Sequence, residues 1–411
     1  MSEVRVNNLS NENNTSGPTI SGITTYSGRH FFVPPQGDTA SRPSDCEPGS
    51  LRFNTDTANL EYFRGNTIGW TEIDAELTSP LGGGPGVYSY QSVSNTGLGV
   101  RGLICGGYDA DSSSGQDRTN IIDFITLSTT GNAQDFGDMT VGASSAGATA
   151  SRTRFIKAGG FMQGNYLGDV IEFNTFASLG NATDFGNLIE ANEATSGVSD
   201  GVRGVFMGGG NPSPTGGNRI QYIDIATTGN SVDFGDTTHS WYAGFAVNDT
   251  IRGIAGGGQT PDSPNNMNNG IDVITIRTTG NATEFGDLTE NSGGRYAAGG
   301  ASNATRGLIA GGRYNPGTYT NSIGFITMAT QGNEINFGDL TLARWEIHGG
   351  MASATRAVFQ SGDSPGIPSA SADNRLDFVQ IATTGNAVDF GDTNDHRRGM
   401  MSASNGHGGL G

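Results

Sequence analysis

The chain has 411 residues, of which 67 are glycine, and its 40 acidic against 22 basic residues give a formal net charge of −18. A surface this acidic repels phosphate backbones and anionic headgroups, which argues against a nucleic-acid-binding protein or one that docks on bare membranes. The polar residues 1–14 do not predict a secretory signal, and no run is long and apolar enough to predict a membrane span. Cys46 and Cys105 lie in different regions, so we expect no disulfide framework.

Residues 1–83 lack the repeat found later in the chain and predict a small β-rich module. Leu51–Phe53 and Leu60–Phe63 alternate apolar and polar residues on either side of a polar turn, which is the pattern of a β-hairpin. With so few apolar residues, we expect the module to pack on a partner or on copies of itself. Residues 79–86, rich in proline and glycine, predict a linker. Further β-rich stretches are expected at Val4–Val6, Ile20–Val33 and Gly69–Ile73.

From residue 84 onward, two phrases recur with a period of about 50 residues, which indicates a repeat architecture. The first phrase is Thr-Gly-Asn-Ala-x-Asp-Phe-Gly-Asp, with its phenylalanine at Phe136, Phe185, Phe234, Phe285, Phe337 and Phe390. The second is Arg-Gly, three apolar residues and Gly-Gly, with its arginine at Arg101, Arg154, Arg203, Arg252, Arg306 and Arg356. Six copies of one supersecondary unit therefore fill residues 84–411, and they predict one body instead of separate domains.

Each copy predicts four short strands and no helix, which is the unit of a β-propeller. In the clearest copy, strands are expected at Arg295–Ala301, Arg306–Gly312, Ile323–Ala329 and through Phe337–Leu340, with a polar loop over Arg313–Asn321. We expect each repeated phenylalanine to be buried between adjacent units, at a gain of about 2 kcal/mol. The fold class predicted is all-β, with six four-stranded blades.

The first blade has two candidates for its first strand. His396–Asn405 and Val87–Asn95 both have a suitable pattern. Because a propeller ring is often closed by pairing a terminal strand with the opposite end of the chain, we expect His396–Asn405 to complete this blade. Whether Val87–Asn95 is displaced or packs beside it stays open.

The blade pattern carries a family resemblance. A Gly-Gly that closes an inner strand, a loop, a strand, a tight turn and an aromatic residue on the last strand resemble the kelch blade over about 320 residues. Phenylalanine replaces the family's usual tryptophan, and Ser361-Gly362 departs from the glycine doublet. The resemblance implies a kelch-like propeller but no particular function, since such propellers serve many unrelated roles.

The N-terminal module carries a second resemblance. Ser2–Leu9 followed by Ser21-Gly22-Ile23 is similar to the opening of tailed-phage appendage proteins, especially those of cyanobacterial phages. The stretch from Ser41 to Trp70, with Gly49–Thr57 and Leu60–Phe63, is similar to a β-module of phage fibre proteins. The resemblance implies a virion protein whose residues 1–83 anchor it to the particle, with a trimer as the family-based guess.

No motif predicts a catalytic, cofactor or metal site. The Asp-Phe-Gly-Asp carboxylates recur in the repeats, so we interpret them as caps of turns that accept backbone N–H bonds, although paired acids or oxygen ligands for a cation would use the same residues. Asp109, Asp111 and Asp117 lack the glycine and glutamate of an EF-hand loop, and the five histidines show no zinc-binding spacing. We therefore expect no enzyme.

The loops between the second and third strands of each blade vary while the strands repeat, and same-type loops lie on one face of a propeller. Their aromatic, amide and acidic side chains suit contact with sugar or protein, although drifting surface loops would show the same variation. The candidate receptor-contact residues are Tyr108, Asp109, Asn211, Asn265, Tyr314 and Tyr319.

We therefore expect a phage virion structural protein, made in the host cytoplasm, whose propeller contacts the host surface. Its expected partners are other virion proteins, copies of itself and a host glycan or protein, with no nucleic acid and no membrane insertion. A purely structural decoration or tail-associated protein is the alternative, and a glycan-processing enzyme is a third. Receptor, copy number, position on the particle and calcium binding by any loop are not decided by the sequence.

Overall fold

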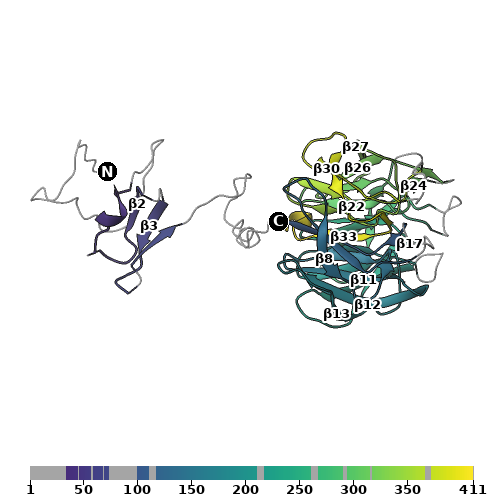
Figure 1. Cartoon of the computed structure of the whole chain (residues 1–411), viewed down its shortest axis with the longest axis horizontal. Coiled ribbons are helices and arrows are strands. Elements are labelled where there is room, and N and C mark those ends of the chain that lie inside the picture. Colours follow the sequence, from purple (N-terminus) through teal and green to yellow (C-terminus); the bar gives the residue numbers. More distant parts are fainter. Residues whose placement is uncertain are drawn as a thin grey trace, which may run out of the picture. The chain divides into compact units, whose positions relative to one another are not determined.

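The computed structural model describes residues 34–44, 46–56, 59–67, 69–73, 100–110, 117–210, 217–260, 267–289, 294–314, 317–365 and 372–410. The chain forms two compact units, Met1–Gly84 and Pro85–Gly411, which divide it one residue away from the expected position (Figure 1). The expectations for Val4–Val6, Ile20–Val33, the linker and Val87–Asn95 lie outside the described residues.

The described part of the first unit is one four-stranded sheet, with strands close to where the sequence predicts them. Its strands, in order across the sheet, are β1 (Gln36–Gly37), β2 (Leu51–Asn54), β3 (Asn59–Phe63) and β4 (Trp70–Ile73), with a short 3-10 turn η1 (Thr39–Ser41). Phe63 and Trp70 pack with ring centroids 5.5 Å apart. On the same face of β3 as Phe63, the Glu61 carboxylate is fully buried between Arg42, at 2.6 Å, and Arg52, at 3.3 Å. Burial raises the pKa of Glu61, but hydrogen bonds from Arg42 and Asn54 outweigh it, so the net pKa is lowered.

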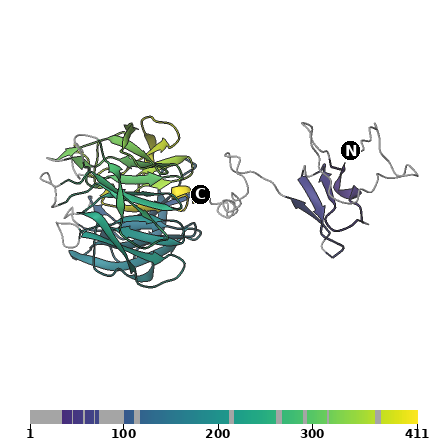
Figure 2. The same cartoon turned by 180° about the vertical axis from the view of Figure 1, so that it is seen from behind.

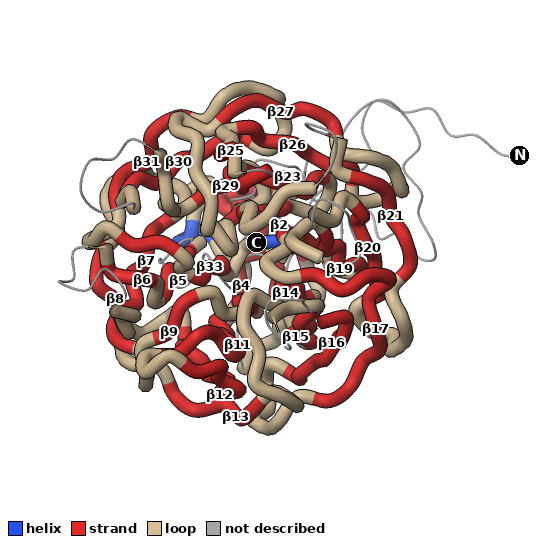
Figure 3. The backbone as a smooth tube through the Cα atoms, turned by 90° about the vertical axis from the view of Figure 1, so that its right-hand side faces the viewer, coloured by secondary structure: helices blue, strands red, loops and turns tan. Residues whose placement is uncertain are grey.

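The described part of the second unit is all-β and contains repeated four-stranded antiparallel sheets, consistent with a β-propeller-like fold (Figures 1 and 3). We number the sheets 1 to 6 by their place in the chain. Sheet 1 contains β33 (Met401–Ser404), β5 (Arg101–Cys105), β7 (Ile121–Thr126) and β8 (Gln134–Asp138). Sheet 2 contains β10 (Gly147–Ala150), β11 (Arg154–Met162), β12 (Tyr166–Thr175) and β13 (Thr183–Asn187), with β9 (Ala143–Ser144) also paired to β11. Sheet 3 contains β14 (Ser196–Ser199), β15 (Arg203–Met207), β16 (Gly217–Asp224) and β17 (Val232–Trp241).

The other three sheets repeat this strand order. Sheet 4 contains β18 (Phe245–Asn248), β19 (Arg252–Gly256), β20 (Gly270–Thr275) and β21 (Thr283–Asp287). Sheet 5 contains β22 (Gly299–Ser302), β23 (Arg306–Ala310), β26 (Ser322–Thr327) and β27 (Ile335–Asp339). Sheet 6 contains β28 (Met351–Ala352), β29 (Arg356–Phe359), β30 (Arg375–Gln380) and β31 (Val388–Asp392). The described residues also form two two-stranded sheets. One pairs β6 (Tyr108–Asp109) with β32 (Arg397–Arg398), and the other pairs β24 (Arg313–Tyr314) with β25 (Thr318–Tyr319).

Sheet 5 differs from its sequence prediction in two places. The first strand begins at Gly299 instead of Arg295, because Ala297 has a left-handed backbone with φ of 56°, which an extended strand does not accommodate. The segment predicted as a polar loop, Arg313–Asn321, contains the hairpin formed by β24 and β25.

Sheet 1 combines the two ends of the second unit. The segment expected as a strand over His396–Asn405 contains β33, which pairs antiparallel with β5 and so occupies the first-strand position of this sheet. After β33, the chain turns inward as η4 (His407–Gly409), which is buried. The His407 Nε2 lies 3.0 Å from the Ala150 carbonyl at the end of β10, and the Arg152 Nε donates to the Leu410 carbonyl at 2.6 Å. The C-terminal turn thus covers one end of the first strands (Figures 2 and 3).

The two halves of the Thr-Gly-Asn-Ala-x-Asp-Phe-Gly-Asp phrase bind each other across neighbouring sheets. In the junction between sheets 1 and 2, the Gly180 N–H donates to the Phe136 carbonyl at 2.8 Å, and the Asp138 N–H donates to the Asn181 Oδ1 at 3.1 Å. The glycine of Asp-Phe-Gly-Asp is required there, because a Cβ on Gly137 would lie 2.5 Å from the Gly180 carbonyl. The same glycine-to-phenylalanine bond recurs at Gly229–Phe185, Gly280–Phe234, Gly332–Phe285, Gly385–Phe337 and Gly131–Phe390.

This junction corrects our interpretation of the repeated acids. The bond that recurs at their position is made by the backbone N–H of the last residue of each phrase, as in Asp138 and Asp392, and not by its carboxylate. Asparagine can therefore replace an acid at this position, as Asn187 does while its N–H still bonds to Asn230 at 3.0 Å.

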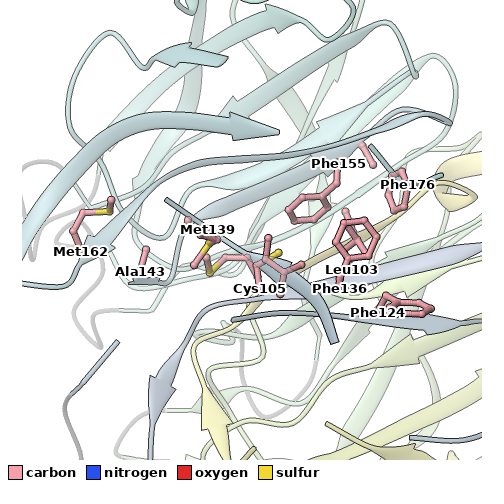
Figure 4. Close-up of a cluster of buried hydrophobic side chains, with 14 residues drawn as sticks. Leu103, Cys105, Phe124, Phe136, Met139, Ala143, Phe155, Met162 and Phe176 are labelled. Atoms are coloured by element: carbon pink, nitrogen blue, oxygen red, sulfur yellow. The ribbon is translucent and has the colours of Figure 1, made fainter. Parts of the chain in front are cut away.

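The repeated phenylalanines fill the core between neighbouring sheets, as the sequence predicts. Phe136 is 2% exposed and packs between Leu103 and Phe124 of its own sheet and Phe155 and Phe176 of sheet 2 (Figure 4). The arginine of the second phrase adds a bond whose role the sequence analysis missed. The Arg101 Nη1 donates to the Phe176 carbonyl of the next sheet at 2.8 Å, and the Arg356 Nη1 of sheet 6 donates to the Leu127 carbonyl of sheet 1 at 2.8 Å.

Candidate binding face

A left-handed residue precedes the first strand of every sheet, by two residues in sheets 1 to 5 and by five in sheet 6. The φ values are 66° for Gly399, 50° for Ser145, 54° for Ala194, 57° for Ala243, 56° for Ala297 and 57° for Glu346. Backbone bonds connect them between sheets; for example, the Ser145 N–H donates to the Gly399 carbonyl at 2.8 Å, and the Gly399 N–H donates to the Glu346 carbonyl at 3.0 Å. A left-handed residue other than glycine is strained, so its recurrence shows that neighbouring chain segments hold it in place.

The residue before each left-handed residue pairs with the residue that follows the Gly-Gly of the same sheet. In sheet 5, for instance, Tyr296 is bridged to Arg313, and in sheet 6 Trp345 is bridged to Asp363. The backbone repeats at these two positions while the side chains do not. We call these residues the binding face, and they are Arg398 with Tyr108, Ser144 with Phe161, Glu193 with Gly210, Tyr242 with Gln259, Tyr296 with Arg313, and Trp345 with Asp363.

The binding face lies at the end of the first strands opposite the C-terminal turn. In each pair of face residues, one precedes the first strand and the other follows the Gly-Gly of the antiparallel second strand, so both lie at the same end of the sheet, whereas η4 contacts Ala150, Ser199 and Asn248 at the far ends of the first strands. Within the second unit, Figure 1 places β24 and the C-terminal end on opposite sides. A small cavity of about 50 Å³, lined by the first strands together with His348 and His407, separates the two ends. This volume suits a few water molecules and not a ligand, so the face itself is the candidate site.

One half of the face is a row of stacked aromatic rings. The Tyr242 and Tyr296 rings stack with centroids 5.7 Å apart, and the Trp345 ring follows 5.3 Å from that of Tyr296. The Arg313 guanidinium covers this row, with its Cζ 4.5 Å from the Trp345 centroid and 5.4 Å from that of Tyr296. Tyr319 packs edge-on to Trp345 at 6.1 Å. The row is partly exposed, and its rings are tilted by 26° and 37° to one another with a cation over two of them.

The other half of the face alternates arginine and aromatic side chains. The Arg118 guanidinium lies between Phe161, at 4.2 Å, and Tyr108, at 4.6 Å, and it donates to the Tyr108 hydroxyl at 3.0 Å. Arg398 covers the Tyr108 ring at 5.3 Å and pairs with Asp363 at 3.2 Å and with Glu346 at 3.5 Å. With Arg313 of the first half, three arginines lie at the face of a chain whose net charge is −18.

Two carboxyl groups, Glu193 in the face and Glu346 beside it, have strongly shifted pKa values. Burial raises the pKa of Glu193 to about 7, although Arg118 and a hydrogen bond with Tyr242 oppose the shift. Burial also raises the pKa of Glu346 to about 7, against the opposing charge of Arg398. Burial likewise raises the pKa values of the Tyr242 and Tyr296 hydroxyls, which therefore stay protonated. At neutral pH these groups offer both donors and acceptors to a polar ligand.

Three buried polar atoms of the face have no hydrogen-bond partner among the described residues. They are the Trp345 Nε1, the Arg313 Nε and the Ser144 Oγ. Buried polar groups in folded proteins are nearly always hydrogen-bonded, so three unpaired polar atoms in the face cost free energy.

The predicted contact residues are only partly brought together. Tyr108 belongs to the face, and Tyr319 packs against its Trp345. Asp109 lies next to it in β6, paired with the Arg397 backbone. Tyr314 is only 5% exposed, so its ring packs inside the protein and is not the accessible aromatic surface that the sequence analysis expected. Asn211 and Asn265 lie outside the described residues.

Trp345, Tyr296 and Tyr242 were not predicted, because variation was sought in the loop between the second and third strands, whereas these rings lie in the segment before the first strand. The available signal was that this one position changes across the copies and is aromatic in three of them, Tyr242, Tyr296 and Trp345. Arg313 lies in the predicted loop but was not among the candidate residues.

The described residues contain no cluster of three or more histidine, cysteine, aspartate or glutamate side chains placed to hold a metal ion. No helix in the described part of the chain is long and apolar enough to cross a membrane. Comparison of the sequence with protein-family models and with curated proteins finds no match.

Proposed function

We propose that this chain is a phage virion structural protein in which a six-bladed, kelch-like β-propeller presents the binding face to the host surface. Residues 84–411 form the propeller, and β33 closes the ring by completing the blade of β5, β7 and β8. The recurring bond between sheets supports this architecture, since the series that begins at Phe136 and Gly180 ends with Phe390 of sheet 6 bound to Gly131 of sheet 1.

The binding face supports attachment as its role. Side chains that differ at two fixed positions of a repeating frame are typical of a surface selected for a ligand and not for folding. The row of Tyr242, Tyr296 and Trp345 offers partly exposed aromatic surface for contact with sugar rings, while Arg313 and the neighbouring carboxyl groups offer hydrogen bonds to hydroxyls. The ligand class proposed is therefore host envelope polysaccharide, bound without a cofactor and without turnover.

The first unit is proposed to anchor the chain to the particle and to assemble it into a homo-oligomer, with a trimer as the family-based guess. The support is its small core, which in the described residues is one four-stranded sheet. This proposal makes other virion proteins its partners and the particle surface or tail its location.

Adsorption of the full-length protein to purified envelope polysaccharide tests the attachment role. We expect Tyr296→Ala and Trp345→Ala each to lower binding by roughly tenfold or more, as hot-spot aromatic residues do. Val388→Ala is the matched control, because Val388 is 58% exposed and lies in β31, outside the face. Equal binding by all three variants would contradict the proposal, and no adsorption to any host glycan would favour a purely structural decoration. Reducing ends released from the glycan would instead indicate an enzyme.

A further inference from the structure

In five of the six sheets, an aromatic ring on the third strand is held between two other side chains. The arginine of the second strand covers one side of the ring, with its Cζ between 4.2 and 4.8 Å from the centroid. The repeated phenylalanine of the fourth strand packs edge-on to the ring, with centroids 6.0 or 6.1 Å apart. The five rings are Phe124, Phe173, Tyr222, Phe325 and Phe378.

Sheet 4 keeps both neighbours of this ring but lacks the ring itself. Val273 occupies the third-strand position, and it packs against the same core as Phe285. The Arg252 guanidinium stays in the position seen elsewhere, because its Nη1 donates to the Met328 carbonyl of sheet 5 and its Nε lies 3.5 Å from the Asp249 carboxylate. Arg252 is therefore fixed in place by its own sheet and the next one, without a ring beneath it.

A cavity of about 460 Å³ lies at this position. Its lining includes Arg252, Val273 and Phe285, with Phe234 from sheet 3 and Gln331 from sheet 5. The volume falls within the roughly 300–1,000 Å³ of small-molecule sites. Thr278, Asn281 and Thr283 also line it and are exposed, so the cavity is accessible from solvent.

We propose that this cavity, which we call the Val273 site, binds a small ligand through a single aromatic ring of the phenyl or phenol class. The five equivalent positions supply the argument, because each shows the same arginine and phenylalanine packed around such a ring. Tyr222 shows that a hydroxyl on the ring is accepted, and the four phenylalanines show that it is not required. The Arg252 guanidinium favours an aromatic ring over a saturated one of the same size, because it is attracted to the negative face of a π-system.

The site lies among the third and fourth strands and their turns, whereas the binding face lies before the first strands and after the Gly-Gly of the second strands. It is therefore separate from the attachment role proposed above, and either can fail without the other.

Ligand-observed fluorine NMR with 4-fluorophenol and the full-length protein tests the Val273 site. We expect saturable binding with a dissociation constant on the order of 1 mM, as for other single-ring fragments. Val273→Phe, which supplies the missing ring, is expected to reduce the affinity at least tenfold. Val388→Phe is the matched control, since it adds the same ring at an exposed valine, and it should leave binding unchanged.

Phe325→Val provides an independent test by creating the same vacancy in sheet 5, between Arg306 and Phe337. We expect this variant to bind two equivalents of 4-fluorophenol. Undiminished binding by folded Val273→Phe would overturn the proposal, as would a single equivalent bound by Phe325→Val. Equal competition by cyclohexanol would overturn its aromatic selectivity.

Discussion

The Asn132 Oδ1 accepts a hydrogen bond from the Asp392 N–H at 3.1 Å, although 260 residues separate the two in the chain. The bond joins sheet 6 to sheet 1 and repeats the contact that joins Asp138 to Asn181 between sheets 1 and 2. One nine-residue phrase therefore carries both halves of the junction, one half for each neighbour. The same phrase therefore accounts both for the period of the repeat and for the contact between neighbouring sheets.

Glycine at the junction between the last and first sheets is expected to be essential. A Cβ on Gly391 would lie 2.4 Å from the Gly131 carbonyl, and the φ of Gly391 is 148°. We expect Gly391→Ala to lower the free energy of unfolding by about 2–4 kcal/mol, through backbone strain and overpacking. Denaturant titration measures the change.

The control for this prediction is Gly131→Ala. Gly131 has a similar φ of 152°, but a Cβ there would meet nothing within 4 Å. The control therefore retains the backbone strain and lacks the steric clash. Its loss of unfolding free energy should be smaller than that of Gly391→Ala, by about 1 kcal/mol or more. Equal losses in the two variants would show that the close approach of the sheets is unimportant.

The buried ion pair in sheet 6 yields a second prediction. Arg344 and Asp377 are fully buried, with the Arg344 Nη1 2.8 Å from the Asp377 Oδ2, and the Thr341 hydroxyl of sheet 5 donates to the same carboxylate. We expect Arg344→Met to cost about 3–5 kcal/mol, because it leaves a buried carboxylate without its cation. Arg344→Met combined with Asp377→Asn should recover part of the loss, as measured by thermal unfolding. Arg375→Met, at a side chain 38% exposed, is the surface control. A double variant no more stable than the single one would contradict this account.

Much of this fold could be predicted because each strand is specified locally. The second strand of sheet 5 was expected over Arg306–Gly312 and is found at Arg306–Ala310, and Phe337 is buried as expected. The junctions could not be predicted, because the bond from Arg356 to Leu127 joins side chain and backbone in different repeats. The period of a repeat predicts which units are adjacent, but it does not predict which atoms form the contacts between them.

The candidate sites were harder to predict for the same reason. Trp345, Arg313 and Tyr296 form one stack only because strand pairing brings the segment before the first strand beside the segment after the second. The Val273 site is different, since aligning the six third strands shows valine where the other copies have phenylalanine or tyrosine. That signal was present in the sequence. Inferring a cavity from it requires knowing that, in the other sheets, the ring packs between the residues equivalent to Arg252 and Phe285.

The C-terminal turn should make stability sensitive to acid. Burial lowers the pKa of His407 to about 4, against the opposing bond to the Ala150 carbonyl, whereas an unfolded histidine titrates near 6.5. Above pH 6.5 both states are neutral, so His407 adds no pH dependence there. As the pH falls from 6.5 towards 4, the unfolded state takes up the proton first, and stability declines.

We expect His407→Gln to remove this decline, which amounts to roughly 2 kcal/mol at pH 5. Urea titrations of both proteins at pH 5 and pH 7.5 measure the difference. His239→Gln is the control, because His239 is exposed. Parallel pH profiles for the wild type and His407→Gln would show that the turn is not held by a neutral histidine. Burial lowers the pKa of His348 to about 4 as well, so His348→Gln should act in the same direction.

The binding face should show the opposite pH dependence. Burial raises the pKa of Glu346 to about 7, whereas an unfolded glutamate titrates near 4.3, so the folded state holds its proton more tightly. The stabilisation from this group is complete below the pKa of the unfolded state and is lost as the pH rises through about 7. We expect Glu346→Gln, which keeps the neutral shape, to stabilise the protein more at pH 8 than at pH 5, by roughly 2 kcal/mol. Denaturant titrations at the two pH values test this, with Glu190→Gln as control because the Glu190 side chain is 38% exposed. A gain that is equal at both pH values would mean that Arg398 keeps Glu346 ionised throughout, and the face would then present a fixed anion beside Trp345.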